Sequence, residues 1–349
     1  MTTRRNLSGG RMSRLRLFAV LFAVLPVVPQ VARASDVLDI VTGPKTGTYY
    51  AIGRDIAAAA AQDGLAVDVK PSEGSIDNIR RVNDPDRAVV GIVQSDVLGF
   101  LSRSKNPASM HMAAGLRMIF PLYDEEVHVL TRDSIHSFAD LKGKKVAVGQ
   151  EGSGNLLTAL NLFAMMNVAP AQMEKISPAE GVVAVLKGEI DAVIFVGGKP
   201  VRLFKNLEDL TLPENQQYAA MLSGVHFLPL VAPRMLAEYK PAEITHADYS
   251  FVQQTVPTIA VQAVLVGYDV PQDGKSDRAQ CRQVAALAGV IRKALPDLRK
   301  KGHPKWKEVN LDADASPWKK DACVWPETSP KADAGKSGLM EIVEKNKGN

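Results

Sequence analysis

The sequence predicts an α/β architecture of the doubly wound kind, in which strands and helices alternate along the chain. Two observations predict it. Short apolar, β-branched runs recur between stretches with helical periodicity. Most of these runs are continuously apolar rather than alternating, which is typical of parallel strands covered on both faces. In such sheets, ligands bind where strands end and helices begin, so the junctions between the elements are the first place to look for function.

The elements follow in chain order. The predicted strands are Leu38–Thr42, Val67–Lys70, Val89–Val93, Met118–Leu122, Val127–Thr131, Lys145–Gly149, Ile190–Val196 and Ile259–Val266. The predicted helices are Tyr50–Gln62, Ser75–Asn83, Asn155–Val168, Ala179–Gly188 and Arg278–Leu295. Residues 327–349 are polar and compositionally biased, so we expect a flexible tail there.

Residues 1–34 have the pattern of a cleavable export signal. An apolar run from Leu17 to Val28 ends before Ala32-Arg33-Ala34, a small-x-small cleavage signature. The positive charges ahead of that run are Arg4, Arg5, Arg11, Arg14 and Arg16. The run is shorter than the roughly 20 residues of a membrane-spanning helix. We therefore expect cleavage after Ala34 and a periplasmic mature protein. The sequence leaves open Sec or twin-arginine export, and Met1 or Met12 as the start.

Removal of the leader changes the charge balance of the chain. The full sequence has a formal net charge of +4. The leader holds six Arg and no acid, so the mature chain has 36 basic and 38 acidic residues. A nearly neutral surface offers no electrostatic footprint for nucleic acid. A run of Lys and Arg between Arg292 and Lys307 is either a solvated helix face or a docking surface.

Two cysteines, Cys281 and Cys323, lie in the same C-terminal region. An oxidising compartment favours a disulfide between them, and the alternative is two buried thiols. The motifs of common enzyme classes are missing from the sequence: no G-x-S-x-G elbow and no H-E-x-x-H or C-x-x-C metal spacing occurs. We therefore expect no enzyme activity, no cofactor and no metal, and we rank an exported enzyme last among the function classes.

Four strand-to-helix junctions are rich in Gly, Ser and Thr: Thr42–Tyr50, Ser72–Asn78, Val93–Asp96 and Gly149–Asn155. Each places small residues and hydroxyls beside backbone N–H groups that have no partner inside the helix, and such helix ends attract anions. Ordinary capping is the alternative at each junction, because Ser, Thr and Asp are the usual N-cap residues. Four such junctions on one α/β pattern favour a shared ligand site.

The order and spacing of these motifs resemble those of the TAXI-type substrate-binding proteins of TRAP transporters. The resemblance is carried by Gly47-Thr48-Tyr49-Tyr50, Gly74-Ser75-Ile76-Asp77-Asn78 and Gln94-Ser95-Asp96, and it extends over about residues 38–310. It implies a two-lobed type II periplasmic binding fold with a hinge of crossover strands. Lobe one would comprise 35–124 and 256–326, and lobe two 125–255. The implied partner is a TRAP-type membrane permease, and we expect a monomer.

The ligand is expected between the lobes. The residues predicted to contact it are Thr48, Tyr49, Ser75, Gln94, Ser95, Asp96 and Tyr123 from lobe one, and Ser153, Gly154, Asn155, Gly198 and Lys199 from lobe two. These loops hold no dense Arg or Lys cluster, which suits a carboxylate bound by neutral donors. Acidic amino acids and small dicarboxylates are the leading candidates. Asp96 either caps the following helix, holds a neighbouring loop or binds a ligand ammonium. The alternative function is a ligand sensor for a membrane signalling protein.

Overall fold

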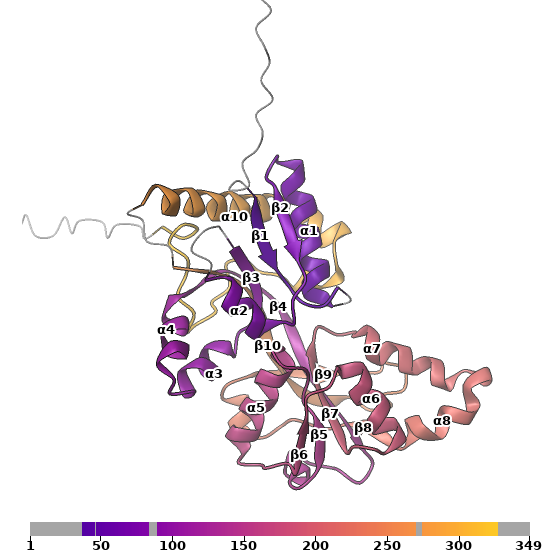
Figure 1. Ribbon diagram of the computed structural model, residues 1–349. Helices are drawn as coiled ribbons and strands as arrows, with labels where there is room; N and C mark the ends of the chain where they lie inside the picture. The colour runs from indigo at the N-terminus through magenta and orange to yellow at the C-terminus, as the bar shows by residue number, and fades with distance from the viewer. Residues whose placement is uncertain (1–36, 46, 84–88, 270–273, 327–349) are drawn as a thin grey trace, which may run out of the picture. The chain divides into compact units, whose positions relative to one another are not determined.

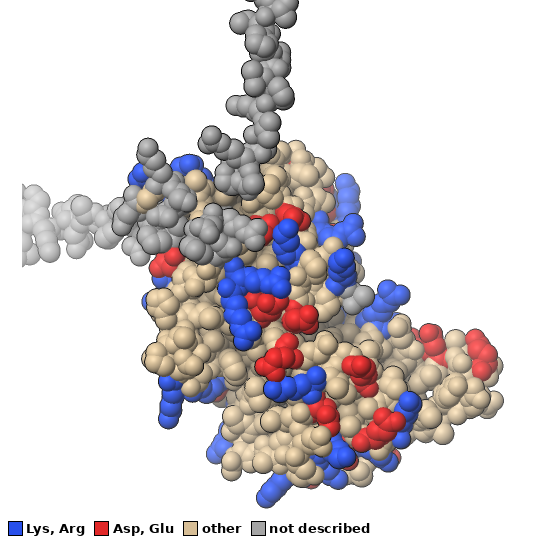
Figure 2. Space-filling view, viewed as in Figure 1, with Lys and Arg blue, Asp and Glu red and all other residues tan. Residues whose placement is uncertain are grey.

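The computed structural model describes residues 37–45, 47–83, 89–269 and 274–326. The predicted signal peptide and the predicted tail lie outside this part of the chain. Within it, no helix combines the length and the apolar character that crossing a membrane requires. Lys and Arg are interspersed with Asp and Glu on the face shown in Figure 2, which agrees with the balanced charge of the mature sequence.

One sheet organises the fold, with the strand order β2-β1-β3-β10-β4-β7-β5-β6; β8 pairs with β4 and β9 with β10 (Figure 1). The strands are β1 (Leu38–Val41), β2 (Val67–Lys70), β3 (Val89–Gln94), β4 (Leu116–Arg132), β5 (Lys145–Ala147), β6 (Gln172–Glu174), β7 (Ala192–Gly197), β8 (Val225–Phe227), β9 (Lys240–Ile244) and β10 (Val256–Tyr268). We call β1–β3 and the helices that pack on them the first half, and β5–β7 with their helices the second half. Each half is internally parallel.

Helices connect these strands. They are α1 (Thr48–Gln62), α2 (Ser75–Arg81), α3 (Val97–Arg103), α4 (Pro107–Gly115), α5 (Gly154–Met166), α6 (Pro178–Lys187), α7 (Arg202–Lys205), α8 (Gln216–Ser223), α9 (Pro233–Leu236) and α10 (Lys275–Lys301). Short 3-10 segments are η2 (Phe138–Leu141), η3 (Asn206–Thr211), η4 (Pro213–Asn215) and η5 (Pro304–Glu308).

Two long strands, β4 and β10, join the halves. β10 pairs antiparallel with β3 of the first half and with β4, and β4 continues to pair antiparallel with β7 of the second half. The prediction of two separate strands at Met118–Leu122 and Val127–Thr131 is therefore wrong. Asp124, Glu125 and Glu126 continue to pair with β10, with Glu125 opposite Val261, after a register shift between Pro121 and Asp124. Two antiparallel crossovers between two parallel halves make this the two-lobed type II periplasmic binding fold, with a hinge of crossover strands.

Continuous apolar strands are buried on both faces, as predicted. Adjacent residues on a strand point to opposite faces. Accordingly, Ile92 joins the core that α1 and α10 cover, whereas Val93 joins a second core with α2 and α3. Val129 and Leu130 divide in the same way between two cores of the second half. Each half thus has its own cores, and Leu157 of α5 in the second half packs into the core that α2 and α3 cover. The lobe boundaries proposed from the sequence stay a prediction.

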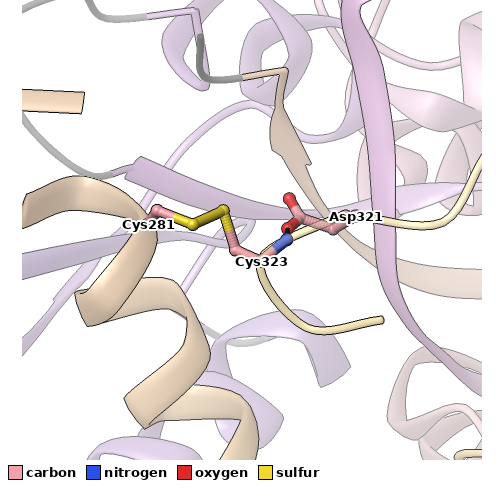
Figure 3. The surroundings of a disulfide bond; sticks show 3 residues. All are labelled: Cys281, Asp321 and Cys323. Atoms are coloured by element: carbon pink, nitrogen blue, oxygen red, sulfur yellow. Dashed lines mark hydrogen bonds between the residues drawn. A yellow bond between two sulfur atoms is a disulfide. The ribbon is translucent and has the colours of Figure 1, made fainter. Parts of the chain in front are cut away.

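A disulfide between Cys281 and Cys323 closes a 42-residue separation between α10 and the C-terminal segment (Figure 3), and it is the pairing that the sequence predicts. The backbone N–H of Cys323 also donates to Asp321 Oδ1, at 2.9 Å. The chain-entropy estimate for a loop of this length is about 4 kcal/mol. The disulfide therefore stabilises the first half by holding its last segment on α10.

Candidate functional site

Loops from the two halves meet at the start of α2 and of α5. The backbone N–H groups of Ile76 and Asp77, in the first turn of α2, donate to the carbonyl oxygen of Gly152, at 3.0 and 3.1 Å. The start of α5 is capped by Ser153, whose hydroxyl accepts from the N–H of Leu156 and donates to the carbonyl of Gln150. The Ser153 side chain is therefore an ordinary N-cap of α5, which is the alternative that the sequence left open at this junction.

Three predicted residues, Ser75, Gln94 and Gly154, come together at this contact. The Ser75 hydroxyl accepts from the backbone N–H of Gln94, at 3.1 Å. A Cβ at Gly154 would collide with Gln94 Oε1 and would lie 2.9 Å from Ser75 Oγ. Only glycine allows the halves to approach this closely at that position. The three residues therefore lie on opposing sides of one narrow interface.

Asp96 links the halves directly. Its Oδ2 accepts hydrogen bonds from Thr158 (2.9 Å), Asn161 (3.3 Å) and Tyr239 (3.1 Å), all in the second half. Burial raises the pKa of Asp96 to about 6, and those bonds offset part of the rise. Its side chain makes no capping bond to α3, so the capping interpretation is wrong, and holding a neighbouring segment is its role here. Among the described residues, its Oδ1 has no hydrogen-bond partner.

A second cluster contains Tyr49, Tyr123 and Glu125. The Tyr49 hydroxyl donates to Glu125 Oε2 at 2.7 Å. Glu125 is only 4% exposed, and burial is the main reason that its pKa is raised to about 8. Tyr123 is 1% exposed, and its hydroxyl has no hydrogen-bond partner within the part of the chain that is described. Burial, followed by the negative charge of Glu125, raises the pKa of Tyr123 well above its ordinary value.

The two clusters are adjacent. The charge of Asp96 contributes to the raised pKa of Glu125, and the Ser75 hydroxyl slightly offsets the burial that raises the pKa of Tyr49. Sequence reasoning missed Glu125. The available signal was three acids, Asp124 to Glu126, standing between two apolar runs.

Gly198 and Lys199 lie beside a buried ion pair instead. Lys305 Nζ is 3.3 Å from Glu126 Oε1 and 2.9 Å from Glu308 Oε2. The backbone N–H of Lys199 donates to Glu126 Oε2, and its ammonium pairs with Asp248 at 3.0 Å. A Cβ at Gly198 would lie 2.5 Å from Lys305 Cε. These residues support the crossover strands rather than the contact between helix ends.

The remaining predicted residues have structural hydrogen bonds or none. Ser95 pairs with Gln262 of β10 through its backbone N–H and its hydroxyl. Asn155 Oδ1 accepts from the N–H of Val196 and so ties α5 to β7. Thr48 is the first residue of α1 and is half-buried. His128 is fully buried against Phe204 and bonds to the Tyr249 hydroxyl, as a packed core histidine.

The described residues provide no metal site at these clusters. No group of His, Cys, Asp or Glu in the described ranges could hold a metal ion. A shallow apolar hollow lies elsewhere, beside β9 and the start of β10, and is lined by Leu230, Val231, Leu236, Pro241, Ala242, Glu243, Pro257 and Thr258. The polar groups that converge between the halves, rather than this hollow, are the candidate site.

Comparison with known proteins identifies a family and several similar solved structures. Residues 40–274 match the model of the NMT1-like family, so the chain belongs to that family. Among solved structures, it is similar to MatC from Rhodopseudomonas palustris with bound malate, at 14% identity and a TM-score of 0.46, over 79% of this chain and 90% of that one. It is also similar to AbpA from Streptococcus pneumoniae bound to L-arginine, at 16% identity and 0.43, over 78% and 95% of the two chains. The periplasmic binding protein BugD is similar at 13% identity and 0.41, again over 78% and 95%.

Proposed function

We propose that this chain is a periplasmic solute receptor, which binds a small carboxylate between its halves and delivers it to a TRAP-type membrane transporter. One observation carries the proposal: polar helix ends from two separately packed halves converge beside the crossover strands that join them. The ligand is an acidic amino acid or a dicarboxylate. The protein performs no chemistry on it.

Hydrogen bonds between the two halves support a mechanism in which the halves close on the ligand. The α2 N–H groups bond to Gly152 and the Asp96 carboxyl bonds to Thr158 across the interface. A ligand carboxylate offers the same helix ends a stronger acceptor, and each charge-assisted bond contributes about 1.5–3 kcal/mol. Three or four such bonds, less the cost of immobilising the ligand, reach micromolar affinity, about −8 kcal/mol. Because the ligand touches both halves only when they are closed, it shifts the hinge toward closure.

Export and the resemblance to TAXI-type proteins support the transport role. The intact mass of periplasmic protein should correspond to a chain that starts at Ser35. A cytoplasmic chain that keeps Arg4 and Arg5 would contradict export. The alternative, a sensor for a membrane signalling protein, shares the same fold and site. A transporter membrane gene beside this gene favours the receptor, and a signalling gene favours the sensor.

Two measurements test the proposed function. Native mass spectrometry of gently purified protein should show a retained small acid. Calorimetry on stripped protein should then give micromolar binding to at least one of L-glutamate, L-aspartate, glutarate and succinate. Gln94→Ala should weaken that binding, whereas Gln253→Ala, at an exposed position, should not. Equal affinities within twofold for the two variants would place the site elsewhere.

A further inference from the structure

Glu125 is a buried acid with too few partners. An ionised carboxylate offers about four acceptor positions. In the described part of the chain, the Glu125 carboxyl receives one hydrogen bond, from the Tyr49 hydroxyl at 2.7 Å, and it takes part in no ion pair. Buried charges are ordinarily paired, because removal from water is costly. The fold therefore leaves acceptor capacity at Glu125 unused.

The unpartnered Tyr123 hydroxyl adds an independent observation at the same place. Tyr123 precedes Glu125 by two residues on β4, and Tyr49, which donates to Glu125, packs on the same core that contains Tyr123. The negative charge of Glu125 also acts on the Tyr123 hydroxyl. Tyr123 is 1% exposed, and its hydroxyl lacks a hydrogen-bond partner among the described residues. A buried hydroxyl of this kind is rare in native proteins and calls for a specific explanation.

The neighbouring cation, the Lys305 ammonium, already pairs with two other acids. Lys305 Nζ lies 3.3 Å from Glu126 and 2.9 Å from Glu308, so it supplies only a distant charge to Glu125. The other acid nearby, Asp96, adds negative charge, and its Oδ1 has no hydrogen-bond partner within the described part of the chain. An incoming carboxylate would be repelled by Asp96, and by Glu125 in its ionised form. A group with several N–H donors and a positive charge matches both the unused acceptors and the sign of the field.

We infer that Glu125 and Tyr123 form a subsite for the protonated amine of the ligand, so that the receptor selects small acidic amino acids over dicarboxylates of the same length. The inference rests on the proposed function. The ammonium donates to Glu125 and to the Tyr123 oxygen, and Tyr49 holds the carboxylate in place. The ligand carboxylate then lies toward the helix ends at Ser75, Gln94 and Gly154.

Paired ligands that differ only in the amine test this subsite. Calorimetry compares L-glutamate with glutarate, and L-aspartate with succinate. The better amino acid should bind the wild type at least thirtyfold more tightly than its dicarboxylate, because a buried charge pair is lost without the amine. Glu125→Gln should reduce that preference to within threefold, and Tyr123→Phe should reduce it in part.

Asp124→Asn is the matched control, since Asp124 is the adjacent acid on β4 but pairs with Lys240 near the surface. It should keep the full preference. Circular dichroism and melting curves establish that each variant is folded; if Glu125→Gln does not fold, the nearly isosteric Tyr123→Phe and the wild-type preference still decide. Equal binding of amino acid and dicarboxylate by the wild type would overturn the amine subsite and leave the carboxylate receptor standing. An unchanged preference in folded Glu125→Gln would do the same. Binding of none of the four ligands contradicts both proposals.

Discussion

Glu125 and Glu126 are neighbours on β4 and are both almost fully buried, but their surroundings differ. Glu126 faces the Lys305 ammonium at 3.3 Å and accepts the backbone N–H of Lys199 at 2.8 Å. Among the described residues, Glu125 receives only the Tyr49 hydroxyl, and the Tyr123 phenol nearby has no hydrogen-bond partner. The chain can therefore supply a cation and a backbone donor to a buried carboxylate, and does so at one position but not at the next. This difference distinguishes an acid that supports the hinge from an acid that is available to a ligand.

Replacing the cation should have the largest effect on stability. Lys305→Met leaves Glu126 buried without its counter-charge, and we expect a loss of about 3–5 kcal/mol in the free energy of unfolding. Chemical denaturation at neutral pH measures it. The double variant Lys305→Met with Glu126→Gln removes the stranded charge and should recover a large part of the loss. If the single variant unfolds like the wild type, the ion pair does not support the hinge.

Replacing Glu125 should instead raise the free energy of unfolding. The pKa of Glu125 in the folded chain is about 8, above its usual value of 4.5, so its favourable contribution is present below pH 4.5 and is lost as pH rises through 8. Glu125→Gln should therefore stabilise the unliganded protein at pH 8, by about 2–4 kcal/mol, with little gain at pH 5. Urea titrations at both pH values test this. Destabilisation at pH 8 would mean that the carboxylate is adequately paired.

Ligand binding should be coupled to a proton at the same residue. Below pH 8 most of the unliganded protein carries a neutral Glu125, and an ammonium requires the ionised form, so binding releases a proton. The affinity for L-glutamate should rise about tenfold from pH 6.5 to 8, whereas that for glutarate should not. The charged groups that act on Glu125 are Glu126, Lys305 and Asp96, together with the Tyr49 hydroxyl. Calorimetry in buffers of different ionisation enthalpy counts the proton; no release at pH 7 would contradict the coupling.

The sequence predicted the sheet better than it predicted the site. Continuous apolar runs gave β1, β3, β7 and β10 to within three residues at either end, because strands buried on both faces leave little ambiguity. The continuity of β4 was missed because Asp124–Glu126 resemble a loop. Strands without such runs, such as β6 (Gln172–Glu174), were missed as well. The contact between Tyr49 and Glu125 spans 76 positions, and no local pattern encodes it.

Within one loop, two predicted side chains have structural roles, and the glycine between them makes the contact with the other half. Ser153 and Asn155 matched the pattern of a binding loop, but their side chains cap α5 and tie it to β7. Gly154, between them, instead lies against Gln94 and Ser75 of the other half. A glycine has no side chain to signal such a role, so only the approach of the two halves reveals it.

Calorimetry of Gly154→Ala against L-glutamate tests whether the ligand is held where the two halves meet, because the added methyl would lie 2.2 Å from Gln94 Oε1 and hinder closure. Gly289→Ala is the matched control, since a Cβ at that exposed position in α10 meets nothing within 4 Å. We expect micromolar binding by the wild type and by Gly289→Ala, and binding at least a hundredfold weaker, about 2.7 kcal/mol, by Gly154→Ala at an unchanged melting temperature. Folded Gly154→Ala that binds L-glutamate as tightly as the wild type would contradict a ligand held where the two halves meet.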